Sequence, residues 1–146
     1  MLEAVGDIFN QPDADGICVT TNGILCSKGN LVMGAGIAKA FKIRWPVLPK
    51  YFGQKVKESG NHVYAYNTGR GYIFSFPTKH HWKNPSDIKL VEQSARELEK
   101  LTYSLCLKKV CLPRPGCVLG GLDWINQVKP LIAAILDNRF VIITRE

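Results

Sequence analysis

The 146-residue sequence contains no apolar run close to the roughly 20 residues that a membrane-spanning helix requires. Its first residues, Met1-Leu2-Glu3-Ala4, also lack the basic stretch and the apolar core of a signal peptide. These two absences argue against a membrane protein and against a secreted one. We therefore expect a cytoplasmic protein with no membrane partner.

Cysteines at metal-binding or redox spacing are absent as well. None of the five cysteines forms a C-x-x-C motif or stands at zinc-finger spacing with a histidine, and an odd number cannot all pair in disulfides. We expect reduced, mostly buried thiols, with no metal site and no other bound cofactor. The cysteines are Cys18, Cys26, Cys106, Cys111 and Cys117.

Internal repeats, low-complexity tracts and Gly/Ser linkers are also missing from the chain. The composition, 46% hydrophobic and 21% charged, is that of a globular protein with a buried core. The sequence therefore predicts a single domain over residues 1–146, and we expect it to be a monomer.

Acidic residues are few: 12 against 19 basic residues give a formal charge of +7, which favours an anionic ligand or partner. The densest basic stretch lies within residues 39–57. We interpret it as the solvated face of two helices, because no RNA-binding motif or basic recognition helix accompanies it, although a nucleic-acid surface remains the alternative.

Strand-like and helix-like patterns alternate along the chain. Strands are predicted at residues 2–5, 16–21, 62–67, 72–76, 109–113 and 139–144, and helices at 35–45, 47–58, 87–105 and 123–136. The segments 62–67 and 72–76 flank Thr68-Gly69-Arg70-Gly71, which predicts a hairpin. The pattern indicates an α/β fold, a three-layer α/β/α sandwich on a mixed central sheet.

A first glycine loop, Val32-Met33-Gly34-Ala35-Gly36, leads directly into a predicted helix. Gly34 and Gly36 would let the backbone approach a phosphate at the helix N-terminus, where free N–H groups and the helix dipole attract anions. The loop lacks the third glycine of the dinucleotide fingerprint, and the connection over residues 22–33 is too long for that turn. Alone, it fits a phosphate site and a purely structural turn equally well.

A second glycine loop, residues 113–121, also follows a predicted strand and runs into a helix. Carboxyl ends of parallel strands meet at one edge of a sheet, where open α/β folds bind ligands. Together the two loops predict a site that holds a diphosphate from both sides.

At this point the sequence resembles the macrodomain family over nearly its whole length. The branch that it resembles contains the terminal ADP-ribose glycohydrolase of animals and the antitoxin macrodomains that reverse DNA ADP-ribosylation. The motifs that carry the resemblance are Gly6-Asp7-Ile8, Thr20-Thr21-Asn22, Val32 to Ala38, Phe76-Pro77-Thr78-Lys79, and Leu112 to Cys117 with Leu122-Asp123-Trp124.

The resemblance implies binding roles for ADP-ribose. Asp7 would accept a hydrogen bond from the adenine amino group beside the backbone of Ile8, and Asn22 would lie near the distal ribose. From the residues alone, Asp7 is also a turn residue and Asn22 a loop residue tolerant of left-handed geometry. The implied diphosphate and distal-ribose contacts are Val32, Met33, Gly34, Ala35, Gly36, Ile37, Thr78, Gly116, Cys117, Val118, Leu119, Gly120 and Gly121.

The resemblance also implies that Lys79 is catalytic, attacking the anomeric carbon of the distal ribose. A lysine amine can form a Schiff base with the ring-opened sugar once burial or nearby positive charge favours its neutral form. His80, His81 and Lys83 are the expected source of that charge. The alternative is a solvated or phosphate-pairing lysine.

Three features depart from the family pattern. Gly120 stands where the animal glycohydrolase has an assisting aspartate, an acid that the antitoxin members also lack. Val118 and Leu119 replace smaller or polar residues and are expected to narrow the distal-ribose pocket. Asp123 is the nearest acid and the alternative source of that carboxylate, but we expect it to cap a helix.

The two histidines, His80 and His81, lie beside Trp82 with no acidic partner at triad or metal spacing. We therefore expect both at the surface or at the rim of the pocket.

Hydrolysis of ADP-ribose from a modified macromolecule or small molecule, with nucleic acid among the candidate substrates, is the predicted function. Two alternatives stay open: an ADP-ribose-binding module without chemistry, and a phosphatase acting on ADP-ribose 1″-phosphate. A nicotinamide dehydrogenase is disfavoured because Glu58, the acid at the approximate spacing of a ribose ligand, falls in a predicted helix.

Overall fold

One mixed sheet organises the computed structural model, which describes residues 1–145. Its strand order is β1-β6-β5-β2-β4-β3, and every neighbouring pair is parallel except the antiparallel hairpin of β3 with β4. The strands are β1 (Leu2–Val5), β2 (Gly16–Thr21), β3 (Ala65–Asn67), β4 (Tyr72–Pro77), β5 (Val110–Leu112) and β6 (Phe140–Thr144). The predicted hairpin is confirmed.

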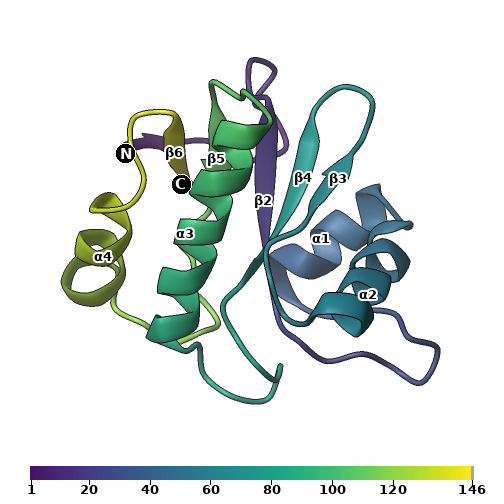
Figure 1. The fold of residues 1–146 in the computed structure, drawn as a ribbon. Coiled ribbons are helices and arrows are strands. Elements are labelled where there is room, and N and C mark those ends of the chain that lie inside the picture. Colours follow the sequence, from purple (N-terminus) through teal and green to yellow (C-terminus); the bar gives the residue numbers. More distant parts are fainter. Residues whose placement is uncertain (146) are drawn as a thin grey trace.

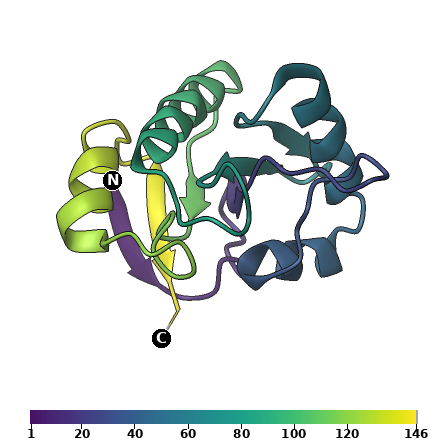
Figure 2. The same cartoon turned by 90° about the horizontal axis from the view of Figure 1, so that it is seen from below.

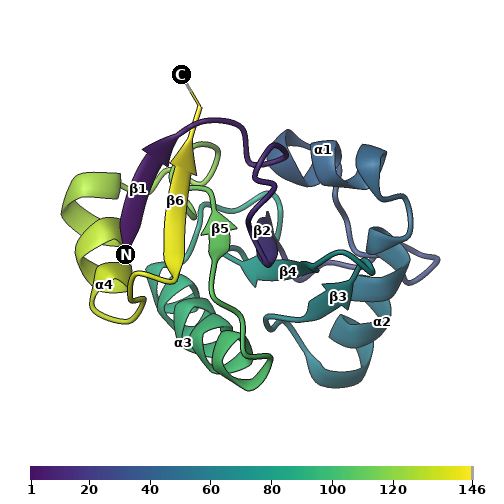
Figure 3. The same cartoon turned by 90° about the horizontal axis from the view of Figure 1, so that it is seen from above.

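Helices cover both faces of this sheet (Figure 1). On one side lie α1 (Gly36–Arg44) and α2 (Leu48–Ser59), and on the other lie α3 (Ile88–Ser104) and α4 (Lys129–Ala133), as the view from above in Figure 3 shows. The predicted three-layer α/β/α sandwich is therefore confirmed. None of the described helices is both long enough and apolar enough to cross a membrane.

Alternation along the strands divides the core into two clusters. In β2, Cys18 packs in a cluster with Val91, Ala95 and Leu98 of α3, whereas its neighbour Val19 packs with Phe41 and with α2. Both β2 residues are completely buried. A strand covered on both faces has no polar side, which explains the continuous apolar pattern of β2.

The last helical segment differs from the single helix predicted over 123–136. Trp124–Val128 forms a π-helical turn, and only then does α4 begin. Pro130 has no N–H to donate to the carbonyl four residues earlier, so the backbone there cannot form a regular α-helix. Asp123 accepts a hydrogen bond from Asn126 N at 3.0 Å, which confirms it as the cap.

The loops that follow β2, β4 and β5 emerge at the carboxyl edge of the sheet, which lies at the lower end of Figure 1 and faces the viewer in Figure 2. The segments at this edge are residues 22–35, 78–87 and 113–123. This arrangement brings both glycine loops to one place.

Candidate functional site

A pocket of about 850 Å³ opens at the carboxyl edge of the sheet. It is lined by residues from every predicted motif, although these motifs lie more than a hundred residues apart in the chain. The lining residues are 7–9, 20–22, 32, 34–38, 40, 78–79, 82, 86, 113–114, 116–120 and 143–145. All predicted site residues except Met33 and Gly121 belong to this lining.

The first glycine loop ends at the N-terminus of α1. Ala35 occupies the cap position with no side-chain cap hydrogen bond, and no acidic residue stands in the first turn. The N–H groups of that turn therefore face the pocket uncapped, at the positive end of the helix dipole. This is an anion-binding arrangement.

Glycine has a different structural role at each of the two glycine positions of this loop. Gly36 has φ +57°, a left-handed conformation that favours glycine. Gly34 has no such strain, and a Cβ added there meets nothing within 4 Å. The left-handed backbone is therefore found at Gly36 and not at Gly34, where the missing side chain leaves the pocket open.

Met33 does not line the pocket. Its side chain is 2% exposed and packs in the core cluster of α1 and α2. The motif gave the position of the backbone correctly but not the direction of this side chain.

The second glycine loop folds tightly around Gly120. Ser86 N donates to the Gly120 carbonyl at 2.9 Å, and a Cβ added at Gly120 would collide with Ser86 Oγ and with the Gly116 carbonyl oxygen. An aspartate at this position would not fit. Gly121, at φ +79°, serves the turn outside the pocket lining.

Lys79 contacts the second glycine loop, and that loop in turn contacts the first. Its Nζ donates to the Leu119 carbonyl at 3.4 Å, and the Leu119 side chain lies against Gly36, where an added Cβ would be 2.9 Å from Leu119 Cδ1. Leu119 thus lines the pocket with its side chain directed at the first glycine loop. Val118 also lines the pocket but leaves 87% of its surface exposed.

The backbone of Lys79 is held on both sides. Its N–H donates to the Thr21 carbonyl at the end of β2, and its carbonyl accepts from Asn61 Nδ2 at 3.1 Å. The neighbouring Thr78 N also bonds Thr21 O, at 3.0 Å. The ends of β2 and β4 and the segment before β3 therefore fix the backbone position of Lys79.

His80 has an acidic partner, contrary to the sequence-based interpretation. Its Nε2 lies 2.9 Å from Asp87 Oδ2, and Asp87 also caps α3 by accepting from Lys89 N. The hydrogen bonds from His80 and Lys89 hold the pKa of Asp87 below its ordinary value of 3.8. The Nε2 atom of His80 is therefore engaged by Asp87.

Asp7 and Asn22 both line the pocket and both hold local turns. Asp7 Oδ1 accepts from Phe9 N at 2.9 Å. Asn22 Oδ1 accepts from Ile24 N, while its Nδ2 donates to Val32 O at 3.0 Å and so ties β2 to the first glycine loop.

The lining residues that were not predicted as site residues include Phe9, Trp82, Ser86 and Arg114. The buried Oγ of Ser86 has no hydrogen-bond partner among residues 1–145. Arg114 stands over the ring of Trp124 at 5.1 Å. Arg114 lies in the motif Pro113-Arg114-Pro115 at the start of the second glycine loop. A cation beside a loop that is predicted to bind a diphosphate could have identified Arg114 as a site residue from the sequence.

Titratable groups beyond Lys79 add little chemistry to the pocket. Burial raises the pKa of the Cys117 thiol, so this lining residue stays neutral at ordinary pH. Within residues 1–145, no three His, Cys, Asp or Glu side chains lie close enough to hold a metal ion.

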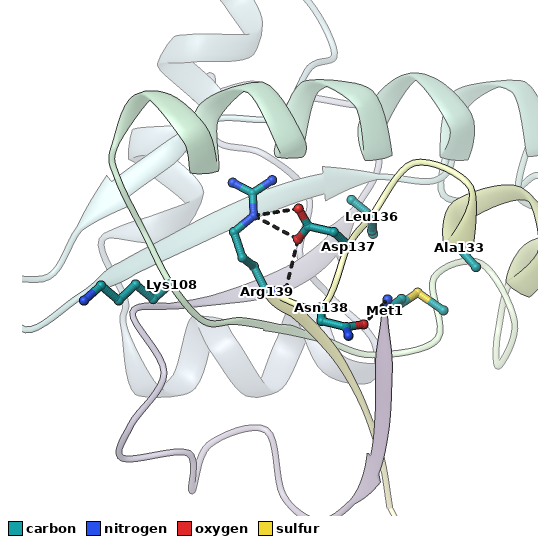
Figure 4. Close-up of a pocket in the computed structure, with 7 residues that line it drawn as sticks. All are labelled: Met1, Lys108, Ala133, Leu136, Asp137, Asn138 and Arg139. Atoms are coloured by element: carbon teal, nitrogen blue, oxygen red, sulfur yellow. Dashed lines mark hydrogen bonds and ion pairs between the residues drawn. The ribbon is translucent and has the colours of Figure 1, made fainter.

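A second cavity of about 610 Å³ lies at the amino edge of the sheet (Figure 4). Its main cation, Arg139, bonds both carboxylate oxygens of Asp137 and also reaches Glu99 at 3.2 Å. The charge of Arg139 is therefore already paired with carboxylates.

Comparison with known proteins extends these observations. No family model matches the chain. The human ADP-ribose glycohydrolase OARD1 is 32% identical over 143 residues, covering 95% of this chain and 86% of the relative. A DNA ADP-ribosyl glycohydrolase of Thermus aquaticus is 34% identical over 114 residues, covering 73% of this chain but only 31% of the relative.

A solved structure, the macrodomain of Mycobacterium tuberculosis DarG, superposes with a TM-score of 0.81 at 27% identity, over 99% of this chain and 95% of that one. The fold, the pocket at the carboxyl edge and the match to OARD1 over almost the whole chain agree with one another. The chain therefore belongs to the macrodomain family, in the branch that contains OARD1 and the DarG DNA ADP-ribosyl glycohydrolases.

Proposed function

We propose that this protein binds ADP-ribose in the pocket and hydrolyses the bond between the distal ribose and a modified macromolecule. The observation that carries the proposal is the position of Lys79. Its amine reaches into the pocket opposite the anion-binding end of α1 and lies 3.4 Å from the Leu119 carbonyl of the second glycine loop.

The pocket offers a complementary group for each part of ADP-ribose. The diphosphate would lie at the uncapped first turn of α1, between the two glycine loops. The adenine would lie at the end where Asp7 and Ile8 line the pocket, and the distal ribose between Asn22 and Lys79. This orientation directs the anomeric carbon toward the lysine amine.

The chemistry starts from the Lys79 amine at that carbon. Lys79 Nζ attacks the anomeric carbon, the bond from that carbon to the macromolecule breaks, and the leaving group takes up a proton. The sugar ring opens to give a Schiff base on Lys79. Addition of water then releases ADP-ribose and regenerates the lysine.

An acid at position 120 has no part in this proposal. The backbone around Gly120 has no room for a side chain, so an assisting aspartate cannot stand there. A route in which the lysine acts as nucleophile fits this site better than one that requires a carboxylate beside it.

ADP-ribosylated DNA is the substrate that we favour, since the matched relatives from Thermus and Mycobacterium are named DNA ADP-ribosyl glycohydrolases. The chain spans 31% of the length of those relatives. The +7 charge is consistent with a polyanionic substrate.

The test combines a calorimetric titration with ADP-ribose and a cleavage panel of ADP-ribosylated oligonucleotide, ADP-ribosylated peptide and ADP-ribose 1″-phosphate. Binding followed by ADP-ribose release from a macromolecule supports the proposal. Binding without release selects a binding module, and release of phosphate alone selects the phosphatase. Absence of binding would refute all three functions.

A further inference from the structure

Trp82 is an exposed aromatic residue in the wall of the pocket. The side chain lines the pocket together with Lys79, yet 48% of its surface is exposed. His81 lies beside it with ring centroids 5.4 Å apart, and Lys83 Nζ lies 5.2 Å from the ring centroid. An indole ring left open to solvent at a ligand pocket indicates a surface for recognition.

The loop that carries Trp82, residues 79–86, is closed by hydrogen bonds between its two ends. Asp87 N donates to Thr78 O at 2.9 Å, and the His80 side chain pairs with that of Asp87. Within the loop, His81 accepts from Lys83 N through Nδ1 and from Asn84 N through its carbonyl, both at 3.1 Å. These bonds order the loop without the ligand, which reduces the entropy lost when a partner binds to Trp82.

The position of Trp82 relative to Lys79 defines what it can contact. Lys79 marks the end of the pocket where the distal ribose would be cleaved, and Trp82 lines the same pocket. We propose that Trp82 stacks on the nucleobase that carries ADP-ribose. This inference rests on the proposed function and adds a residue that selects nucleic-acid substrates.

The chemistry around Trp82 favours a base over a peptide side chain. A planar ring stacks on any nucleobase, and a neighbouring cation reads the adjacent phosphate. Lys83 supplies that cation, and the charged residues of the pocket lining are Lys79, Arg114 and Arg145 against one carboxylate, Asp7. Apart from the attached ADP-ribose, a modified glutamate side chain offers neither a planar ring nor a phosphate.

The test measures binding to a Lys79→Ala protein, so that ligands are not turned over, with and without Trp82→Ala. The ligands are free ADP-ribose, a single-stranded oligonucleotide ADP-ribosylated on a base, and a peptide ADP-ribosylated on glutamate. Trp82→Ala should weaken oligonucleotide binding about tenfold and leave the other two affinities within about twofold. Trp82→Phe should retain most of the oligonucleotide affinity.

Tyr103→Ala is the matched control, because Tyr103 is an aromatic residue 75% exposed near the far end of α3. Three results would overturn the inference: no loss for the oligonucleotide, an equal loss for free ADP-ribose, or an equal loss for the peptide. Failure of the proposed hydrolysis is recognised separately, as absence of cleavage by the wild-type protein. In that case the binding measurements still decide the role of Trp82, and absence of ADP-ribose binding would refute both.

Discussion

Lys79 Nζ donates a hydrogen bond to the carbonyl oxygen of Leu119, 3.4 Å away, so the lysine and the second glycine loop touch across the pocket before a ligand binds. The side chain of Leu119 lies against Gly36 of the first glycine loop. ADP-ribose has to enter between these groups. The apolar side chain of Leu119 therefore opposes the approach of a phosphate to the backbone at Gly36.

Leu119→Ala is expected to strengthen ADP-ribose binding about two- to fivefold, because it uncovers the backbone of Gly36 and retains the Leu119 carbonyl. The effect on stability should be within about 0.5 kcal/mol, since the side chain is 67% exposed. Calorimetry and denaturant unfolding measure the two quantities. Val118→Ala, at a side chain 87% exposed, is the control. Weaker binding by Leu119→Ala would mean that Leu119 contacts the ligand favourably.

Gly120→Ala is expected to destabilise the protein by about 1–3 kcal/mol, because the new Cβ would collide with Ser86 Oγ and the Gly116 carbonyl. Gly120→Asp should behave in the same way and should not raise the cleavage rate. Gly34→Ala serves as the comparison for stability, since nothing lies within 4 Å of its added Cβ. A Gly120→Asp protein that is stable and faster than wild type would contradict this account of the second glycine loop.

Asn61 positions Lys79 through the bond from its Nδ2 to the lysine carbonyl at 3.1 Å. Asn61→Ala should lower kcat about tenfold and destabilise the fold by about 1 kcal/mol, with little change in ADP-ribose affinity. Steady-state kinetics and calorimetry on the same protein separate these effects. If Asn61→Ala changes stability but leaves kcat at the wild-type value, Asn61 has only a structural role.

The His80–Asp87 pair makes stability depend on pH in a defined direction. The pKa of Asp87 is lowered in the folded protein, so its contribution is present above the ordinary value of 3.8 and is lost as pH falls through the folded value. Asp87→Asn should cost only a few tenths of a kcal/mol at pH 7, because the pair is solvent-screened, with 65% of the His80 side chain and 39% of the Asp87 side chain exposed. The difference from wild type should shrink below about pH 4.

Asp87→Ala removes the α3 cap as well as the charge, and should cost about 1 kcal/mol. Urea unfolding over pH 3 to 7 compares the three proteins. A difference between wild type and Asp87→Asn that grows as the pH falls would be inconsistent with a lowered pKa.

Local patterns were sufficient to predict the sheet and both glycine loops. Buried strands such as β2 are recognised by their apolar and β-branched residues. Glycines at the start of a helix indicate where the backbone is open to an anion. Because carboxyl ends of parallel strands share one edge, the sequence also predicted that the loops would meet there.

Side-chain directions and contacts through turns could not be predicted in this way. The pairing of His80 with Asp87 spans a loop with no periodicity, and Met33 points into the core although its neighbours line the pocket. The π-helical turn before α4 depends on the missing N–H of Pro130 together with the packing of Trp124. Each of these features depends on contacts between segments that only the folded chain brings together.

The rate of ADP-ribose release from an ADP-ribosylated oligonucleotide, measured for wild type and Lys79→Ala under single-turnover conditions, tests the central claim most directly. Lys89→Ala, which removes an exposed lysine of α3, is the control. We predict that Lys79→Ala lowers the rate by about a hundredfold or more while ADP-ribose affinity stays within a few fold of wild type. A Lys79→Ala protein that cleaves the substrate at the wild-type rate would contradict the account.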